Sequence, residues 1–149
     1  MKVILKEQNQ KQKIVEVDSL KLKTIYNLLK CSSIECFGYV KKLQENNIDI
    51  VLDEEGKLTY KPQLNIVIEN DEQKIVDILV GNVLFVGVDG EDWVGLNKEQ
   101  IDIVNSLLNS NMSYMILDNK IINTSILYII IGGSTSTYGI NKIINEGDN

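Results

Sequence analysis

Short apolar stretches separated by polar residues recur along the chain, and most of them are typical of strands. Residues 3–5 and 14–17 flank a polar stretch, so they are expected to pair as a hairpin. Residues 34–40 and 48–52 predict a second hairpin, with Asn46-Asn47 as the turn signal before its second strand. The pattern therefore favours antiparallel pairing in the first third of the chain.

The middle of the chain contains the strongest strand signal. Residues 78–87 are nearly all apolar, as in a strand that is buried on both faces, and are expected to form the central strand. Residues 58–68 contain the only proline, Pro62, which predicts a loop or an edge strand. Gly56 closes the acidic turn before this segment and is expected at a left-handed turn position.

Two segments carry apolar residues at helical spacing. Asp18 or Ser19 is expected to cap the first helix, which ends near residues 31–33. Asn97 is the expected cap of the second helix, and Gln100 completes a capping box. The apolar stripes are Leu22, Ile25, Leu28 and Leu29 in the first helix, and Ile101, Val104, Leu107 and Leu108 in the second, with Leu96 and Ile101 placed as a hydrophobic staple.

Beyond residue 109 the pattern changes to a further hairpin, residues 114–117 and 121–131, followed by a loop rich in glycine and hydroxyl groups. The whole pattern predicts an α+β fold: a mostly antiparallel sheet, two packed helices and a C-terminal β-hairpin extension. Residues 1–108 are expected to form the core domain, and residues 109–149 an extension that packs on the core or lies in an oligomer interface. The expected core is Leu22, Ile25, Leu29, Ile50, Leu52, Ile78, Val80, Leu84, Val86, Ile101, Val104 and Leu108.

The amino-acid composition excludes several kinds of catalytic and binding site. The 149 residues include no His, and every basic residue is Lys. The usual general base and the commonest zinc ligand are therefore missing. An anion must be held by Lys, hydroxyl groups, Asn side chains or backbone N–H groups. The formal net charge of −6 argues against general nucleic-acid binding, which needs a basic face.

The remaining candidates for catalysis are weak. Cys31 and Cys36 have no His to activate them, and their spacing matches neither a redox motif nor a metal site. The acidic pairs Asp53-Glu54 and Glu91-Asp92 fall in predicted turns, where solvated carboxylates are the rule, although such oxygens could also ligate Mg²⁺. We therefore expect a protein that is not an enzyme and has no cofactor and no metal site. No apolar run approaches the roughly 18 residues of a membrane span.

The loop of residues 132–139 is the candidate binding site. It follows an apolar strand and combines hydroxyl side chains with backbone N–H groups, so it could form an anion nest around a phosphate or a ribose. A flexible linker is the alternative. The apolar run 126–131 before it is expected in the core or in a homo-oligomer contact. The candidate ligand-binding residues are Gly132, Gly133, Ser134, Thr135, Ser136, Thr137, Tyr138 and Lys142.

Several short motifs occur in a characteristic order. They are the opening MKVILK, the helix after Val17-Asp18, Ile34-Glu35, the turn 53–58, the segment 61–65, the stretch 77–87, Gly90-Glu91-Asp92-Trp93 and the segment 96–101. Across residues 1 to about 108 this order resembles a family of phage- and plasmid-borne domains, the domain of unknown function 3846. The resemblance implies a phage or plasmid context and assigns no catalytic residues. The residues from 109 onward lie outside it.

We expect a non-enzymatic binding protein of a phage or mobile element that counters a host defence. Acting in the cytoplasm of the host cell, it would sequester a small nucleotide-type immune signal. A protein–protein inhibitor or adaptor that uses the acidic segment 44–102 as its contact face is one alternative, and an oxygen-ligated metal-dependent enzyme is another. The expected partners are a small anionic ligand or a host protein, together with further copies of this chain, but neither nucleic acid in general nor a membrane.

Overall fold

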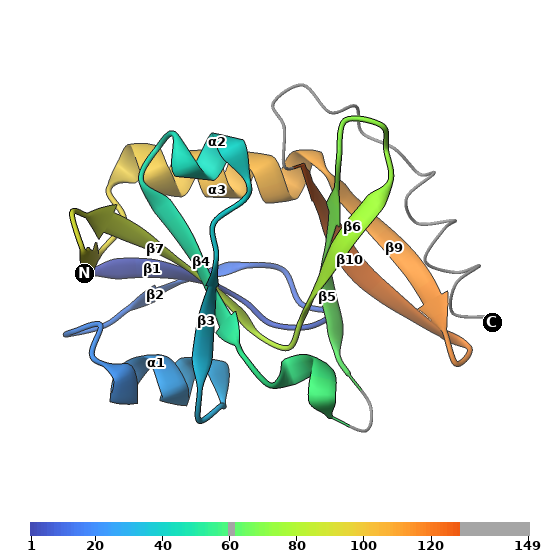
Figure 1. Cartoon of the computed structure of the whole chain (residues 1–149), viewed down its shortest axis with the longest axis horizontal. Helices are drawn as coiled ribbons and strands as arrows, with labels where there is room; N and C mark the ends of the chain where they lie inside the picture. Colours follow the sequence, from blue (N-terminus) through green and yellow to red (C-terminus); the bar gives the residue numbers. More distant parts are fainter. Residues whose placement is uncertain (60–61, 129–149) are drawn as a thin grey trace.

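The computed structural model describes residues 1–59 and 62–128, in which two sheets and three helices pack together (Figure 1). The fold is α+β with mostly antiparallel sheets, as the sequence predicts. The elements are β1 (Lys2–Lys6), β2 (Lys13–Glu16), α1 (Leu22–Leu29), β3 (Ile34–Phe37), α2 (Lys41–Gln44), β4 (Ile48–Asp53), the 3₁₀ turn η1 (Gly56–Leu58), β5 (Leu64–Glu69), β6 (Ile75–Val80), β7 (Val83–Asp89), β8 (Asp92–Val94), α3 (Lys98–Ser110), β9 (Met112–Leu117) and β10 (Lys120–Tyr128).

The first sheet has the order β2-β1-β7-β4-β3, with the short β8 also paired to β7. All its pairs are antiparallel, and the pairings β1–β2 and β3–β4 predicted for the first third of the chain are confirmed. The first strand of the second pair ends at Phe37, however, and the unpredicted helix α2 lies between β3 and β4. In this sheet Phe85 of β7 lies opposite Ile4 on one side and Ile50 on the other. Helix α1 covers one face of the sheet, whereas α2 and α3 cover the opposite face (Figure 1).

The second sheet has the order β6-β5-β10-β9. Strands β9 and β10 form the predicted C-terminal hairpin, with Asp118 (φ 51°) and Asn119 (φ 63°) in the positive-φ conformations that a two-residue hairpin turn requires. Strand β10 also pairs in parallel with β5, so that Ile126 lies opposite Val67. Residues 112–128 therefore share a sheet with residues 64–80.

The prediction of one central strand over residues 78–87 is wrong. The chain turns at Gly81, whose φ of +78° suits glycine, and β6 and β7 then run in different sheets. Strand β7 is central in the first sheet, whereas β6 is at the edge of the second. The loop or edge strand expected over residues 58–68 also needs correction, because β5 lies between β6 and β10 and Pro62 precedes it.

The local predictions for the helices had mixed outcomes. The capping box of α3 is confirmed: Asn97 Oδ1 accepts a hydrogen bond from Gln100 N at 2.8 Å, and Gln100 Oε1 accepts one from Asn97 N at 2.9 Å. Neither Asp18 nor Ser19 caps α1, whose first turn follows Lys21 without a side-chain cap. Gly56 is not at a left-handed position; it is buried where an added Cβ would lie 3.2 Å from the Val80 carbonyl oxygen.

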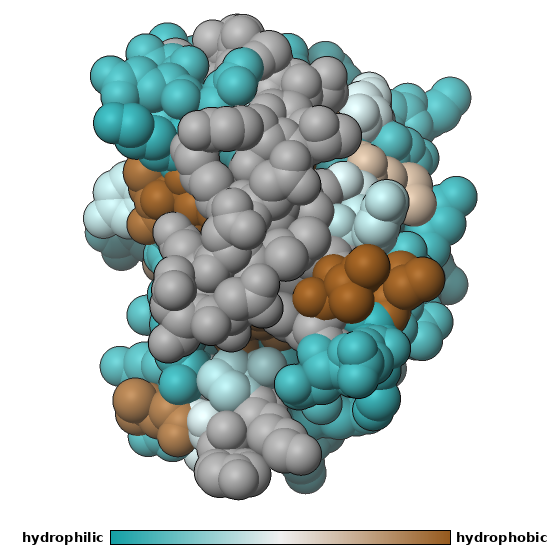
Figure 2. All heavy atoms as spheres, turned by 90° about the vertical axis from the view of Figure 1, so that its right-hand side faces the viewer, coloured by the Kyte–Doolittle hydropathy of each residue, from teal (hydrophilic) through white to brown (hydrophobic). Residues whose placement is uncertain are grey.

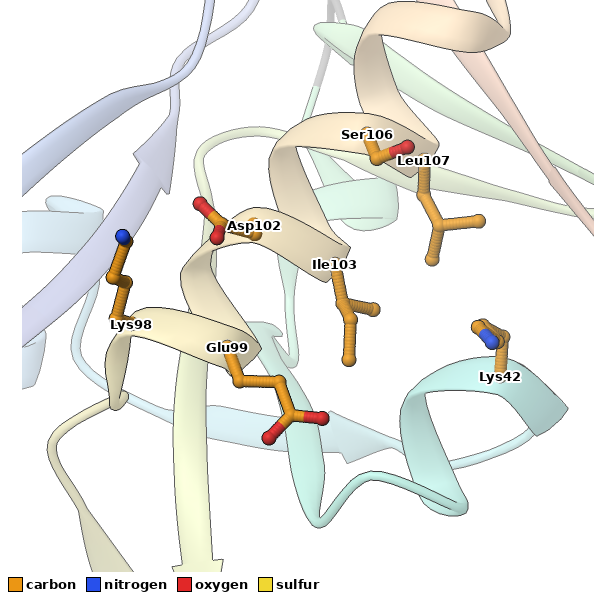
Figure 3. Close-up of a pocket in the computed structure, with 7 residues that line it drawn as sticks. All are labelled: Lys42, Lys98, Glu99, Asp102, Ile103, Ser106 and Leu107. Atoms are coloured by element: carbon orange, nitrogen blue, oxygen red, sulfur yellow. The ribbon is translucent and has the colours of Figure 1, made fainter.

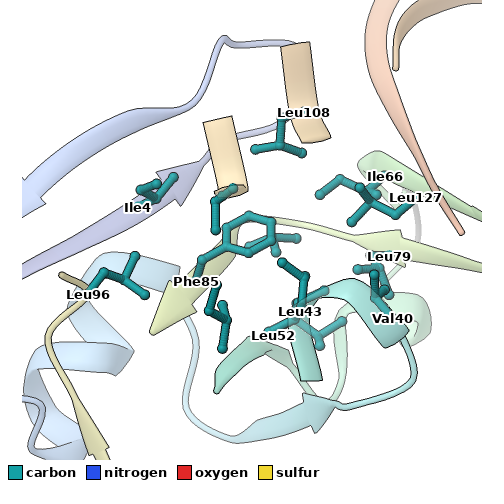
Figure 4. Packing of buried hydrophobic residues seen from close by; sticks show 14 of the residues in the cluster. Ile4, Val40, Leu43, Leu52, Ile66, Leu79, Phe85, Leu96, Leu108 and Leu127 are labelled. Atoms are coloured by element: carbon teal, nitrogen blue, oxygen red, sulfur yellow. The ribbon is translucent and has the colours of Figure 1, made fainter. Parts of the chain in front are cut away.

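Among the described residues, three clusters of buried side chains hold the layers together. The largest joins the first sheet to α2, α3 and the second sheet around Phe85, as Figure 4 shows. A second cluster packs α1 against the opposite face of the first sheet. Of the predicted core residues, only Leu22 is exposed, at 54%, and Ile78 is half-buried. Within the described residues, no helix is long and apolar enough to cross a membrane.

Candidate functional site

The two sheets leave a cavity of about 510 Å³ where β6 ends and β7 begins. We call it the junction cavity. Its wall contains residues from the loop after β1, the end of α1, the end of β4, η1 and the β6–β7 turn. Residues that are far apart in the sequence therefore meet there, because the chain passes from one sheet to the other at this point.

The wall of the junction cavity is mainly polar and offers both donors and acceptors. The amide side chains are those of Gln8, Gln10, Gln63 and Asn82, and Thr59 adds a hydroxyl group. Amides can donate and accept hydrogen bonds at the same time, so this wall suits a ligand with mixed polar edges. Leu29 and Val80 supply apolar surface beside them.

Three charged residues complete the wall: Glu7, Lys30 and Asp53. Lys30 ends α1 in a left-handed conformation, with φ at 55°. Glu7 Oε1 lies 2.8 Å from Lys13 Nζ, and this contact holds the pKa of the Glu7 carboxyl below its usual value. Glu7 is therefore ionised at neutral pH and is a poor proton donor.

A buried polar network ties the two sheets together beside the junction cavity. Asn65 of β5 is fully buried, and its Nδ2 donates hydrogen bonds to the carbonyl oxygens of Lys6 at 2.8 Å and Gly81 at 2.7 Å. Its Oδ1 accepts a bond of 3.0 Å from Lys6 Nζ, which also donates to the Glu7 carbonyl oxygen at 3.2 Å. Asn65 thus fixes the position of the β6–β7 turn against the end of β1.

A groove of about 630 Å³ lies along α3, between this helix and α2 (Figure 3). Ile103 and Leu107 point from α3 toward α2, which contributes Lys42. Glu99 and Asp102 add negative charge along the same helix. The groove is larger than the junction cavity, but nearly all its lining comes from one exposed helix face. It is therefore better suited to a protein surface than to an enclosed small molecule.

The site predicted from the sequence and the junction cavity involve different residues. The predicted binding residues Gly132, Gly133, Ser134, Thr135, Ser136, Thr137, Tyr138 and Lys142 all lie outside the described residues. Sequence reasoning missed the junction cavity and the Lys6–Asn65 network. The available signal was the presence of single polar residues within apolar stretches, namely Lys6 after VIL, Asn65 within LNIVI and Asn82 after LVG.

The two cysteines do not form a disulfide. Burial of the sulfur, together with the negative charge of Asp49 and Glu35, raises the pKa of the Cys36 thiol to about 11. Burial and Asp53 raise the pKa of Cys31 as well. Both groups are therefore thiols at neutral pH, and thiols are poor nucleophiles compared with thiolates.

The acidic turns do not form one surface. The turn after β4, the turn between β5 and β6 and the turn between β7 and β8 lie at different ends of the molecule (Figure 1). Within residues 1–59 and 62–128, no three Asp, Glu or Cys side chains gather closely enough to hold a metal ion.

A family model described as "Domain of unknown function (DUF3846)" matches residues 1–109 of the chain. The chain belongs to this family. The matched segment includes the end of β6 and the β6–β7 turn, which line the junction cavity. It stops within α3. No curated protein and no solved structure matches the chain.

Proposed function

We propose that this member of the family is a non-enzymatic binding protein, which holds a small nucleotide-type ligand in the junction cavity. The cavity itself is the observation that carries the proposal. Its volume of about 510 Å³ falls within the roughly 300–1,000 Å³ of small-molecule sites. Its wall offers many groups for recognition and few for proton transfer.

The chemistry of the wall favours a nucleotide-type ligand over a purely apolar one. Asn and Gln amides can form paired hydrogen bonds with the edge of a nucleobase. Gln63 precedes β5 and Asn82 precedes β7, and both side chains line the cavity. Lys30 supplies a cation for a phosphate group, and the neighbouring side chain of Leu29 can contact a base or a sugar.

The biological role is the wider part of the proposal. A binding protein carried by a phage or plasmid would act in the cytoplasm of its host. There it would counter a host defence by removing a nucleotide-type immune signal from solution without cleaving it. The phage and plasmid context comes from the family resemblance, and the binding mode comes from the junction cavity.

Substitution of two amides tests the site directly. The double variant Gln63→Ala/Asn82→Ala is expected to weaken ligand binding by about tenfold or more, because each lost hydrogen bond contributes about 0.5–1.5 kcal/mol. Calorimetry with nucleotides that serve as immune signals measures the change. Asn27→Ala is the matched control, since Asn27 is exposed on α1 and does not line the cavity.

The outcome separates the junction cavity from the loop predicted at residues 132–139. If a Ser134/Thr135/Ser136/Thr137-to-Ala variant loses binding while Gln63→Ala/Asn82→Ala keeps the affinity of the parent, the ligand does not use the junction cavity. Truncation after Leu108 is a less specific test, because it removes β10, an internal strand of the second sheet.

The groove between α2 and α3 favours a second candidate function, a protein–protein inhibitor or adaptor. Its apolar floor of Ile103 and Leu107 is flanked by the charged residues Lys42, Lys98, Glu99 and Asp102. It would therefore suit a host protein with an apolar contact surrounded by charges of both signs. The alternative predicts that Ile103→Lys abolishes capture of such a partner and leaves nucleotide binding unchanged.

Homo-oligomer formation is a further part of the proposal. Strand β9 is at the edge of the second sheet. On the hairpin that it forms with β10, Met112, Tyr114, Ile116 and Ile121 are each about half exposed or more. Figure 2 shows this side of the molecule, with separate hydrophobic areas among hydrophilic ones. Exposed apolar edges of this kind favour association.

A further inference from the structure

Lys6 is a buried cation that forms no ion pair with any of the described residues. Its side chain is 3% exposed, and its Nζ donates to two neutral oxygens, those of the Asn65 amide and the Glu7 carbonyl. The ion pairs among the described residues involve Lys13, Lys41, Lys57 and Lys74 instead. Since an ammonium group has three donors, these two bonds leave one N–H of Lys6 without a partner in the part of the chain that the structure describes. A lysine in such a place is costly unless an anion compensates it.

Lys6 also lines a small cavity, separate from the junction cavity and about 140 Å³ in volume. We call it the Lys6 cavity. Thr124 and Ser125 of β10, both buried, form part of its wall, together with Asn123. Gln10, Lys11 and Gln12 close it from the loop after β1. The space is too small for a nucleotide, but it is large enough for a tetrahedral oxyanion.

Hydrogen bonds hold the loop over the Lys6 cavity. Asn9 Oδ1 accepts a bond of 2.7 Å from the backbone N–H of Asn123. Gln12 Nε2 donates to Asn105 Oδ1 at 3.1 Å and to Asn109 Oδ1 at 2.8 Å, which connects the loop to α3. The loop is therefore anchored to β10 and α3, and this part of the cavity wall is preorganised.

We propose that the Lys6 cavity binds a small oxyanion, a sulfate or phosphate group, through the ammonium group of Lys6. Lys11 and the amide groups of Gln10 and Asn123 are the further donors on its wall. The oxyanion is either free in solution or the phosphate of the ligand proposed above, and only this second source rests on the proposed function. Gln10 lines both cavities, so a ligand in one lies near the other.

Binding of the oxyanion depends on the proton of Lys6. Burial lowers the pKa of Lys6 from 10.5 to about 8. The other charged groups near it are Glu7, which is paired with Lys13, and Lys11. Beside Lys6, β5 presents the amide of Asn65 and β10 the hydroxyl groups of Thr124 and Ser125, whereas the buried carboxyl of Glu69 is at the other end of β5. Affinity should therefore be constant below about pH 8 and fall about tenfold per pH unit above it.

Sulfate is the best probe, because it does not titrate in this pH range. We expect saturable NMR shifts of the amides of Lys6 and of residues 123–125 when sulfate replaces chloride at constant ionic strength. Lys6→Met should weaken binding by about tenfold to a hundredfold. Lys2→Met is the matched control. Lys2 is exposed on the same strand, and its substitution removes the same charge.

Three results would overturn the inference. They are the absence of saturable shifts in the parent protein, equal affinity in Lys6→Met, and a decline of affinity that begins only near the ordinary lysine pKa of 10.5. The pH series needs only the parent protein, so the test remains decisive even if Lys6→Met fails to fold.

Competition then identifies the source of the oxyanion, with adenosine monophosphate and adenosine as probes. If adenosine monophosphate displaces sulfate and adenosine does not, the Lys6 cavity binds the phosphate of a larger ligand. If neither compound displaces sulfate, the cavity binds a free anion. Absence of sulfate binding by the parent protein, together with intact nucleotide binding, would overturn the oxyanion inference while leaving the proposed function in place.

Discussion

Replacing Leu84 with alanine is expected to lower the free energy of unfolding by about 2–5 kcal/mol. Leu84 is fully buried in β7, where it packs with Val3, Leu5 and Ile25 under α1. The substitution removes its contacts on the central strand and leaves a cavity that the neighbouring β1 and β4 can only partly close. Urea denaturation followed by circular dichroism measures the change.

Leu58→Ala is the matched control for this prediction. Leu58 is 82% exposed in η1, so the same chemical change should alter the free energy of unfolding by less than about 0.5 kcal/mol. A loss well under 1 kcal/mol for Leu84→Ala would contradict the central position of β7.

Raising the pH is expected to stabilise the protein through Lys6. In the folded state its pKa is about 8, whereas the unfolded chain keeps the value of 10.5. Between these two values the unfolded state binds more protons, so the free energy of unfolding rises with pH. Between pH 8 and pH 10.5 the free energy of unfolding should rise by about 3 kcal/mol in total.

A comparison of variants isolates this effect from the titration of other groups. Urea denaturation of the parent, Lys6→Met and Lys2→Met at a series of pH values between 7 and 11 measures it. The parent and Lys2→Met should gain stability relative to Lys6→Met above about pH 8. Parallel curves for all three proteins would show that Lys6 is not desolvated in the folded state.

The sequence predicted those elements whose signals are local. The capping box at Asn97 and Gln100 and the hairpin predicted after residue 109 depend on a few neighbouring side chains, and both were found. The break at Gly81 was missed because the residues on both sides are apolar, and one long strand has the same hydropathy pattern as two shorter ones. The parallel pairing of β5 with β10 depends on tertiary packing, which no local pattern encodes.

The candidate site was less predictable than the fold. The junction cavity combines Glu7, Lys30, Gln63 and Asn82, which only the topology of the two sheets brings together. Lys6 carried a weak signal, because the alternation in β1 places it on the same face as the buried Ile4. A charged residue there indicates either a partner or a function, and the sequence alone could not supply the neighbouring Asn65.

Native mass spectrometry of the protein purified from its host tests the central claim most directly. The account predicts a small nucleotide-type molecule retained in stoichiometric amount on each chain, which the Gln63→Ala/Asn82→Ala variant loses and Asn27→Ala keeps. The same spectrum gives the number of chains per particle. Retention of that molecule by the double variant at the level of the parent, or a parent spectrum that contains only the mass of the polypeptide, would contradict the account.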